Sequence, residues 1–402
     1  MKRRRVKITG IGPVTPAGIG REAFWSGILE PVSRVRPYTK LGTEFGPFVA
    51  AHIPSFDVNK YVNRSQVPKG AARQSLFAIA GAMLALADAG IDPADLQKIS
   101  TAVIAGSSIM DFGGVSSSIE GVQRRGARGA LPRVLFAIGI GSVPSAIGEV
   151  LGLNVRAMAV STQCSSGLDA VGYAADLVAN GEADLAICGG TEAPLHRFPL
   201  VELRAADLTP QTAEMPDRIS RPFDLWRTTG VVSEGACMFV LEPEESPRPG
   251  YSFIAGHAFA SDEKGELCGG MVEAGKFALA EGGIRPDQVE AISAWGPGHK
   301  LVDAGEARAM QKLFGEALRD IPTVSVKGAI GTPLGAAPAI QVAAAALGQR
   351  QGMIPPTVNW DYPDPACPLN LSNRARTLEH AWTLVNTHGL GAVNSSMVLH
   401  RC

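Results

Sequence analysis

The chain has 402 residues, of which 46% are hydrophobic and only 6% are aromatic, and it contains 46 glycines. This length allows two domains or one large two-lobed core, and the composition suits an α/β protein whose helices pack closely on sheets. The formal net charge of −1 gives no electrostatic preference for nucleic acid or for acidic membranes, so we expect neither as a partner.

Ten short apolar segments read as strands, and they fall into two groups of five. The first group consists of residues 6–10, 102–106, 156–161, 185–188 and 237–241. The second group consists of residues 253–258, 289–294, 323–327, 382–386 and 396–400. A polar, proline-broken segment at 243–250 separates the two groups.

These runs are rather continuously apolar, as expected for strands that helices cover on both faces. Helical segments lie between several of the strands. The pattern therefore predicts a duplicated α/β fold with two similar halves, residues 1–245 and residues 246–402.

No targeting or membrane-spanning segment is predicted. The basic residues 2–5 precede an apolar stretch that is too short and too broken for a signal peptide. The longest apolar run, 76–87, falls short of the roughly 18 residues of a membrane span and predicts a buried helix. The cysteines are scattered, with no C-x-x-C pair and no clustering with histidine, which indicates a reducing, cytoplasmic setting and no metal site. They are Cys164, Cys188, Cys237, Cys268, Cys367 and Cys402.

Residues 110–135 form a polar, glycine-rich insertion between the second and third predicted strands. It includes Arg124, Arg125 and Arg128. We interpret it as a cap or as a contact between subunits, and a solvated loop explains the same pattern equally well.

Cys164 lies where a buried strand meets an amphipathic helix. After it, apolar residues recur at helical spacing from Leu168 to Val178, and Asn180-Gly181 supplies a stop signal. A thiol at this turn faces the unpaired N–H groups of the first helical turn, so we expect a lowered thiol pKa and donors for an oxyanion. The alternative is that Cys164 is a small buried apolar residue.

Six stretches, in order along nearly the whole chain, resemble motifs of the β-ketoacyl synthases of the thiolase superfamily, in their elongating and polyketide branch. They are residues 6–12 with 15–16, 162–170, 189–192, 221–224 with 234–236, 327–337 with 355–359, and 386–391. The resemblance implies a thiolase-like fold, with a duplicated five-layered αβαβα architecture and mixed sheets.

The resemblance also implies a two-step acyltransferase reaction in fatty acid or polyketide biosynthesis. An acyl group moves to Cys164 from the phosphopantetheine arm of an acyl carrier protein, and a malonyl thioester then decarboxylates and attacks the acyl carbonyl. Two histidines stabilise the enolate, supported by a lysine and an acidic residue. No permanently bound cofactor is implied. The partners implied are the carrier protein and, in a dimer, a second copy or a ketosynthase homologue, with the strand before Cys164 near the interface.

The chain departs from the family pattern at both histidines. Counting back from Asp303 places Trp295 at the first histidine position, and Thr332 takes the second. Lys327 is kept as a catalytic candidate, and Gln341 stands where the family usually has glutamate.

Two histidines in loops that border the nucleophile are candidates to replace the missing donors. These are His299 and His388, and the alternatives are that His299 is a surface loop residue and that His388 merely fills the space of an aromatic. We predict that Trp295, Thr332, Gly389 and Leu390 contact the substrate. The other histidines are interpreted as packing or surface residues: His52, His196, His257, His380 and His400.

Two functions from different classes fit these residues. The first is a ketosynthase-like enzyme that loads Cys164 and condenses through a rearranged donor set, or that retains acyl transfer alone. The second is a non-catalytic partner similar to the chain-length factors, which the loss of both histidines favours and the retention of Cys164 opposes. A thiolase-like enzyme that uses free coenzyme A is disfavoured, because the matching motifs are those of the carrier-protein branch.

Overall fold

The computed structural model describes residues 3–41 and 44–402, and its central sheet is built from two five-stranded halves. The first half contains β1 (Val6–Thr15), β5 (Thr101–Gly106), β6 (Arg156–Val160), β7 (Leu185–Glu192) and β8 (Gly235–Pro243). The second half contains β9 (Ser252–Ser261), β10 (Ala291–Ser293), β11 (Thr323–Val324), β14 (Trp382–Gly389) and β15 (Val393–Arg401). Each of the ten predicted strands is present.

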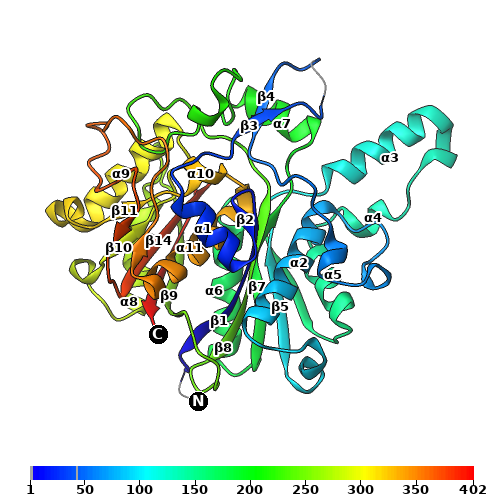
Figure 1. Ribbon diagram of the computed structural model, residues 1–402, viewed down its shortest axis with the longest axis horizontal. Coiled ribbons are helices and arrows are strands. Elements are labelled where there is room, and N and C mark those ends of the chain that lie inside the picture. The colour runs from blue at the N-terminus through cyan, green and yellow to red at the C-terminus, as the bar shows by residue number, and fades with distance from the viewer. Residues whose placement is uncertain (1–2, 42–43) are drawn as a thin grey trace.

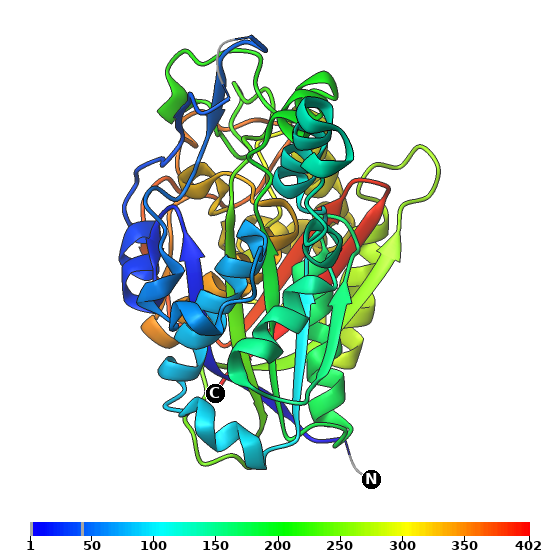
Figure 2. The ribbon, with the colours of Figure 1, turned by 90° about the vertical axis from the view of Figure 1, so that its right-hand side faces the viewer.

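Both halves have the same strand order and the same strand directions. The first runs β6-β5-β7-β8-β1 and the second runs β11-β10-β14-β15-β9, with two parallel pairings followed by two antiparallel ones in each. A short antiparallel pairing joins them, Val6 with Ile254 and Lys7 with Phe253. The predicted duplication is therefore confirmed, and the start of β1 and the C-terminus lie toward the lower end of the molecule in Figures 1 and 2.

Helices form three layers around the two half-sheets. Buried helices α6 (Ser166–Ala179) and α11 (Ala337–Gln351) contact each other in the middle, at the centre of the largest apolar cluster. On the outer faces, α2 (Arg73–Asp88) and α5 (Ser142–Leu151) cover the first half, and α8 (Gly270–Glu281) and α9 (Lys300–Phe314) cover the second (Figure 1). This is the expected αβαβα order. The short elements are β2 (Gly18–Ile19), β3 (Arg36–Tyr38), β4 (Phe48–Ala50), β12 (Met353–Ile354), β13 (Arg376–Thr377), α1 (Arg21–Leu29), α7 (Arg197–Ala205) and α10 (Lys327–Ile330).

The insertion at 110–135 is mostly helical, so its interpretation as a solvated loop is wrong. It holds α3 (Phe112–Arg125), which extends away from the body of the molecule, and α4 (Val134–Ala137), which lies beside α5 (Figure 1). The Asp111 carboxylate caps α3 by accepting from two backbone N–H groups, and two arginines in its last turn complement the helix dipole. Beyond it, Leu135 and Phe136 are 78% and 83% exposed. A role as a subunit contact stays a prediction.

Two further expectations concern single elements. The apolar run at 76–87 lies inside α2, as predicted, and among the described residues no helix has the length and apolar character to span a bilayer. The strand predicted at 323–327 is too long, because β11 ends at Val324 and Lys327 begins α10.

The close approach of β5 to α6 gives a testable prediction about the nucleophile's support. A Cβ added to Gly106 would lie 2.2 Å from the Ser166 carbonyl oxygen, in the first turn of α6. We expect Gly106→Ala to destabilise the protein by ~1–3 kcal/mol, as overpacking of a filled core does. Urea unfolding measures this, with Gly139→Ala as the control because no atom lies within 4 Å of the added Cβ. Equal unfolding midpoints for the two variants would contradict the argument.

Candidate active site

Cys164 sits on a sharp turn between β6 and α6. Gln163 has φ of 55°, in the left-handed region that non-glycine residues seldom adopt. Ser165 stands at the N-cap position of α6 without a side-chain cap bond, and its hydroxyl lies 2.6 Å from the Thr387 hydroxyl on β14. A Cβ on Gly389 would lie 3.2 Å from the Cys164 nitrogen, so the end of β14 passes directly against the turn. The thiol is therefore held between the two halves of the molecule.

A cavity of about 480 Å³ opens at the thiol, and Cys164 is 8% exposed. Six of the eight predicted site residues line it: Cys164, Trp295, His299, Thr332, His388 and Leu390. Most of the remaining lining is apolar, such as Leu203, Val231 and Leu267. None of the lining residues, all of which belong to the described ranges, is a lysine or an arginine. The cavity can therefore hold an apolar chain next to the sulfur.

Burial raises the pKa of the Cys164 thiol to about 12, and the nearby Glu192 carboxylate adds to the rise. The expected lowering of this pKa is therefore wrong, because loss of hydration outweighs the helix terminus. The backbone N–H groups of Leu390 and of Cys164 itself lie close to the sulfur and oppose the rise.

The raised thiol pKa predicts how Cys164 responds to iodoacetamide, which reacts with the thiolate. Because only a minor fraction is ionised at neutral pH, alkylation should accelerate roughly tenfold per pH unit from about pH 7 to about pH 10 without levelling off. Peptide mass spectrometry separates Cys164 from the other thiols. A plateau below about pH 9 would show a thiol of ordinary or lowered pKa instead.

Lys327 does not line the cavity but lies behind Trp295. Its ammonium nitrogen is 4.1 Å from the centroid of the Trp295 ring and donates to the Gln341 side-chain oxygen at 2.8 Å. Burial lowers the pKa of Lys327, which favours its neutral form. Lys327 therefore supports the cavity wall from behind, and the Trp295 indole separates Lys327 from a substrate in the cavity.

Two buried carboxylates on α9 hold the loop that carries Trp295 and His299. Glu306 accepts from the Trp295 and Gly296 N–H groups, each at 2.8 Å, and Asp303 accepts from Gly298 at 3.1 Å. His299 caps α9, since its Nδ1 accepts from two backbone N–H groups at 3.3 and 3.4 Å. His299 is thus both a helix cap and a wall of the cavity.

His388 is bound from behind by a pair of residues that the sequence reasoning missed. In the β14–β15 hairpin it is the direct cross-strand partner of Asn394, and its Nδ1 lies 2.9 Å from the Asn394 side-chain oxygen. The Asn394 amide nitrogen donates to Asp262 at 2.7 Å. Only the register of the hairpin reveals this contact, because six residues separate the two partners.

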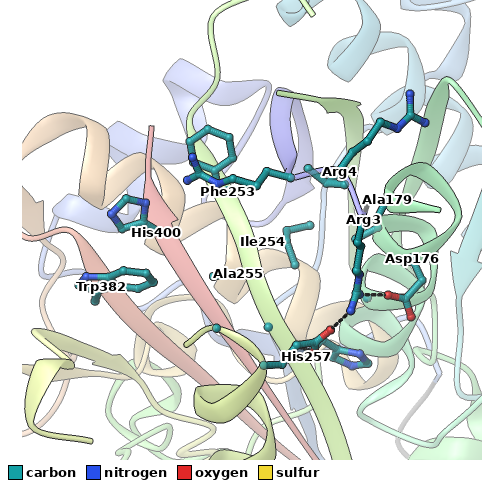
Figure 3. A pocket seen from close by; sticks show the side chains of 17 residues that line it. Arg3, Arg4, Asp176, Ala179, Phe253, Ile254, Ala255, His257, Trp382 and His400 are labelled. Atoms are coloured by element: carbon teal, nitrogen blue, oxygen red, sulfur yellow. Dashed lines mark hydrogen bonds and ion pairs between the residues drawn. The ribbon is translucent and has the colours of Figure 1, made fainter. Parts of the chain in front are cut away.

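A second pocket, of about 320 Å³, lies beside the N-terminal segment, α6 and β9 (Figure 3). Arg3 there forms ion pairs with both Asp176 and Glu281, and the backbone N–H of His257 donates to Glu281 at 2.8 Å. Arg4 donates to backbone carbonyls and Arg5 pairs with Glu244, so the arginines have partners, and the lining contains no cysteine within the described residues. We therefore assign the chemistry to the Cys164 cavity.

Comparison with known families decides the identity of the chain. The model of the "Beta-ketoacyl synthase, N-terminal domain" family matches residues 3–246, and that of the "Beta-ketoacyl synthase, C-terminal domain" family matches residues 251–361. The chain belongs to the β-ketoacyl synthase family. The predicted family and thiolase-like fold are thus confirmed for this ketosynthase, whereas the roles of individual residues stay predictions.

Similar proteins cover essentially the whole ketosynthase. It is 33% identical to a putative polyketide β-ketoacyl synthase 1 of Streptomyces virginiae, over 99% of this chain and 98% of the relative. It is also 33% identical to 3-oxoacyl-[acyl-carrier-protein] synthase 2 of Rhizobium meliloti (strain 1021), over 99% of each. The solved ishigamide ketosynthase/chain length factor superimposes with a TM-score of 0.92 at 28% identity, covering 100% of both chains. The match is therefore to whole ketosynthases.

Proposed function

We propose that this ketosynthase takes an acyl group from a carrier-protein thioester onto Cys164, in fatty acid or polyketide biosynthesis. The observation that carries the proposal is the thiol at the wall of an apolar cavity, with the Leu390 and Cys164 N–H groups at its sulfur. The Cys164 thiolate attacks the thioester carbonyl, and these N–H groups hold the oxyanion. The pantetheine thiol leaves and takes up the proton that Cys164 released.

The donor of the acyl group is proposed to be the phosphopantetheine arm of an acyl carrier protein, with no resident cofactor. The Rhizobium relative is named for that carrier. Apolar lining residues such as Leu203 and Val232 suit the hydrocarbon part of the acyl group, whose burial contributes about 0.8 kcal/mol per CH₂.

For the second step we propose condensation with a malonyl-type extender through an atypical donor set. Trp295 and Thr332 occupy the places that the resemblance gives to histidines, and neither can exchange a proton as imidazole does. In neutral His299, Nδ1 accepts two N–H groups, so the proton sits on Nε2, which can donate. His388 donates from Nε2 only when its ring is protonated, because Nδ1 is bonded to Asn394.

We further propose that the protein works as a dimer, either of identical chains or with a ketosynthase homologue. Strand β6 is the outer strand of its half-sheet, pairs only with β5 in the described chain, and is largely exposed. An exposed edge strand is a ready pairing surface. The solved relative named as a ketosynthase/chain length factor supports the heterodimeric alternative.

A non-catalytic, chain-length-factor-like role is the second candidate. Trp295 and Thr332 favour this role, because they stand where the resemblance places the two histidines that donate N–H groups during condensation. The retention of Cys164 at the cavity opposes it. The decisive difference is therefore whether Cys164 becomes acylated.

Intact-mass spectrometry after incubation with hexanoyl carrier protein tests the proposal. We expect one hexanoyl adduct on the wild-type chain and on Cys402→Ser, which removes the exposed thiol, and none on Cys164→Ala. Absence of an adduct on a folded wild-type chain, under conditions that acylate an active ketosynthase, would support the partner role instead. With malonyl carrier protein added, His388→Phe should sharply reduce the condensation product, and unchanged product would remove His388 from that step.

A further inference from the structure

The hydrogen bonds behind His388 determine which of its ring nitrogens carries the proton. The Asn394 amide nitrogen donates to Asp262 at 2.7 Å and to the Ala260 carbonyl at 3.3 Å, so the amide oxygen is the atom that faces His388. That oxygen can only accept, which makes the His388 Nδ1 the donor in their 2.9 Å bond. The neutral ring therefore carries its proton on Nδ1.

The Asp262 side chain is held in place by backbone N–H groups. It accepts from the Cys268 N–H at 3.0 Å and from the Gly270 N–H at 2.9 Å, and its second oxygen lies 3.9 Å from the His388 Nδ1. Its carboxylate orients Asn394 by accepting from the amide nitrogen. Asp262 thus orients Asn394, and Asn394 orients His388, in the way that an orienting residue holds the base of a catalytic triad.

The consequence lies at Nε2, the other ring nitrogen. Among the described residues, no hydrogen bond occupies it, and His388 lines the cavity that contains Cys164. An unprotonated Nε2 accepts a proton rather than donating one. His388 is therefore arranged as a base toward the cavity, whereas His299, with Nδ1 engaged as an acceptor, is arranged as a donor.

A base at Nε2 suits an acceptor that has to lose a proton as it attacks. An alcohol or an amine carries such an O–H or N–H proton, whereas a malonyl thioester generates its carbon nucleophile by losing carbon dioxide and needs N–H donors instead. Apolar lining residues such as Trp295 and Pro297 can hold an uncharged acceptor next to the sulfur.

We propose that acylated Cys164 passes its acyl group to a neutral alcohol or amine, with His388 as the general base and Asn394 and Asp262 as positioning residues. The His388 Nε2 takes the proton of the acceptor O–H or N–H while the oxygen or nitrogen attacks the thioester carbonyl. The tetrahedral intermediate collapses with cleavage of the C–S bond, and the Cys164 thiolate recovers the proton from His388. The products are an ester or amide and the free enzyme. This activity rests on the proposed acylation of Cys164.

The test starts from hexanoyl-enzyme, whose adduct on Cys164 is first verified by intact mass. Benzyl alcohol, benzylamine or malonyl carrier protein is then added, and products are identified by liquid chromatography with mass spectrometry. We expect benzyl hexanoate or N-benzylhexanamide, formed faster than the condensation product. His388→Phe should slow this transfer by ~10²-fold or more, with each rate expressed per hexanoyl-enzyme formed by that variant. His388→Gly should be slow as well, and added imidazole should restore part of its rate.

Asn394 has its own prediction as a positioning residue. Asn394→Ala should lower kcat of the transfer about tenfold per hexanoyl-enzyme formed, and Asn394→Asp, which keeps an oxygen acceptor for Nδ1, should retain more of kcat. Thermal unfolding of each variant checks that it is folded.

The outcomes separate the two proposals. Failure to form hexanoyl-enzyme overturns the proposed function and, with it, this inference. A stable adduct that yields only the condensation product or only free hexanoic acid overturns the inference alone. Transfer that is unchanged in folded His388→Phe also overturns it.

Discussion

Replacing both Trp295 and Thr332 by histidine is expected to raise decarboxylative condensation by ~10²-fold or more over the wild-type chain. The two substitutions restore imidazoles at the positions where the family resemblance places them, and one missing oxyanion donor typically costs 10²–10³ in rate. Both residues line the Cys164 cavity, and the Thr332 hydroxyl is buried without a hydrogen-bond partner in the part of the chain that the structure describes. Glu306 holds the backbone on both sides of position 295 irrespective of the side chain.

The measurement is the amount of β-ketoacyl product formed from hexanoyl-enzyme and malonyl carrier protein. Trp295→Phe and Thr332→Val serve as matched controls, since they alter the same walls without supplying a ring nitrogen. No gain in a folded, acylated double variant would show that the two positions do not limit condensation. A gain of condensation in the controls would show that the effect comes from a changed cavity shape rather than from new N–H donors.

Removing the Glu192 carboxylate is expected to destabilise the protein by at least ~3 kcal/mol. Glu192, at the end of β7, is fully buried and accepts from the Ser108 N–H at 2.8 Å, the Ser107 hydroxyl at 2.9 Å and the Gly335 N–H at 3.1 Å. Glu192→Ala takes this acceptor from all three donors, and a buried donor left without a partner costs about 1–3 kcal/mol; loss of the side chain also leaves a cavity in the core. The substitution also removes the hydrogen bond that links the loop at Gly335 to the first half of the molecule.

Urea unfolding and acylation of Cys164 measure the two consequences. Glu182→Ala is the control, because Glu182 forms an exposed ion pair with Arg156 whose loss should change stability by less than ~1 kcal/mol. We expect Glu192→Ala to lose stability and acylation together and Glu192→Gln, which keeps one acceptor oxygen, to lose less. Equal stability of the two alanine variants would refute the role given to Glu192.

The sequence by itself determined the elements and the turn that carries the thiol. Strand and helix periodicity depend on neighbours along the chain, so the position of β6, the Cys164 turn and the stop of α6 at Asn180 were predictable. The expected burial of β6 is wrong, because β6 lies at the edge of the sheet and is largely exposed in the described chain. The duplicated grouping of ten apolar runs likewise anticipated two halves with one strand order. The family motifs then placed Trp295, Thr332 and the two histidines at one site.

Tertiary structure alone decided the electrostatics and the partners of those residues. Burial by distant segments raises the pKa of Cys164, places Lys327 behind Trp295, and makes a helix cap of His299. The register of β14 on β15 sets Asn394 opposite His388 and so fixes the ring tautomer. Hydration and cross-strand contact depend on segments that meet only in the folded chain, which is why local pattern identified the thiol and the fold determined its chemistry.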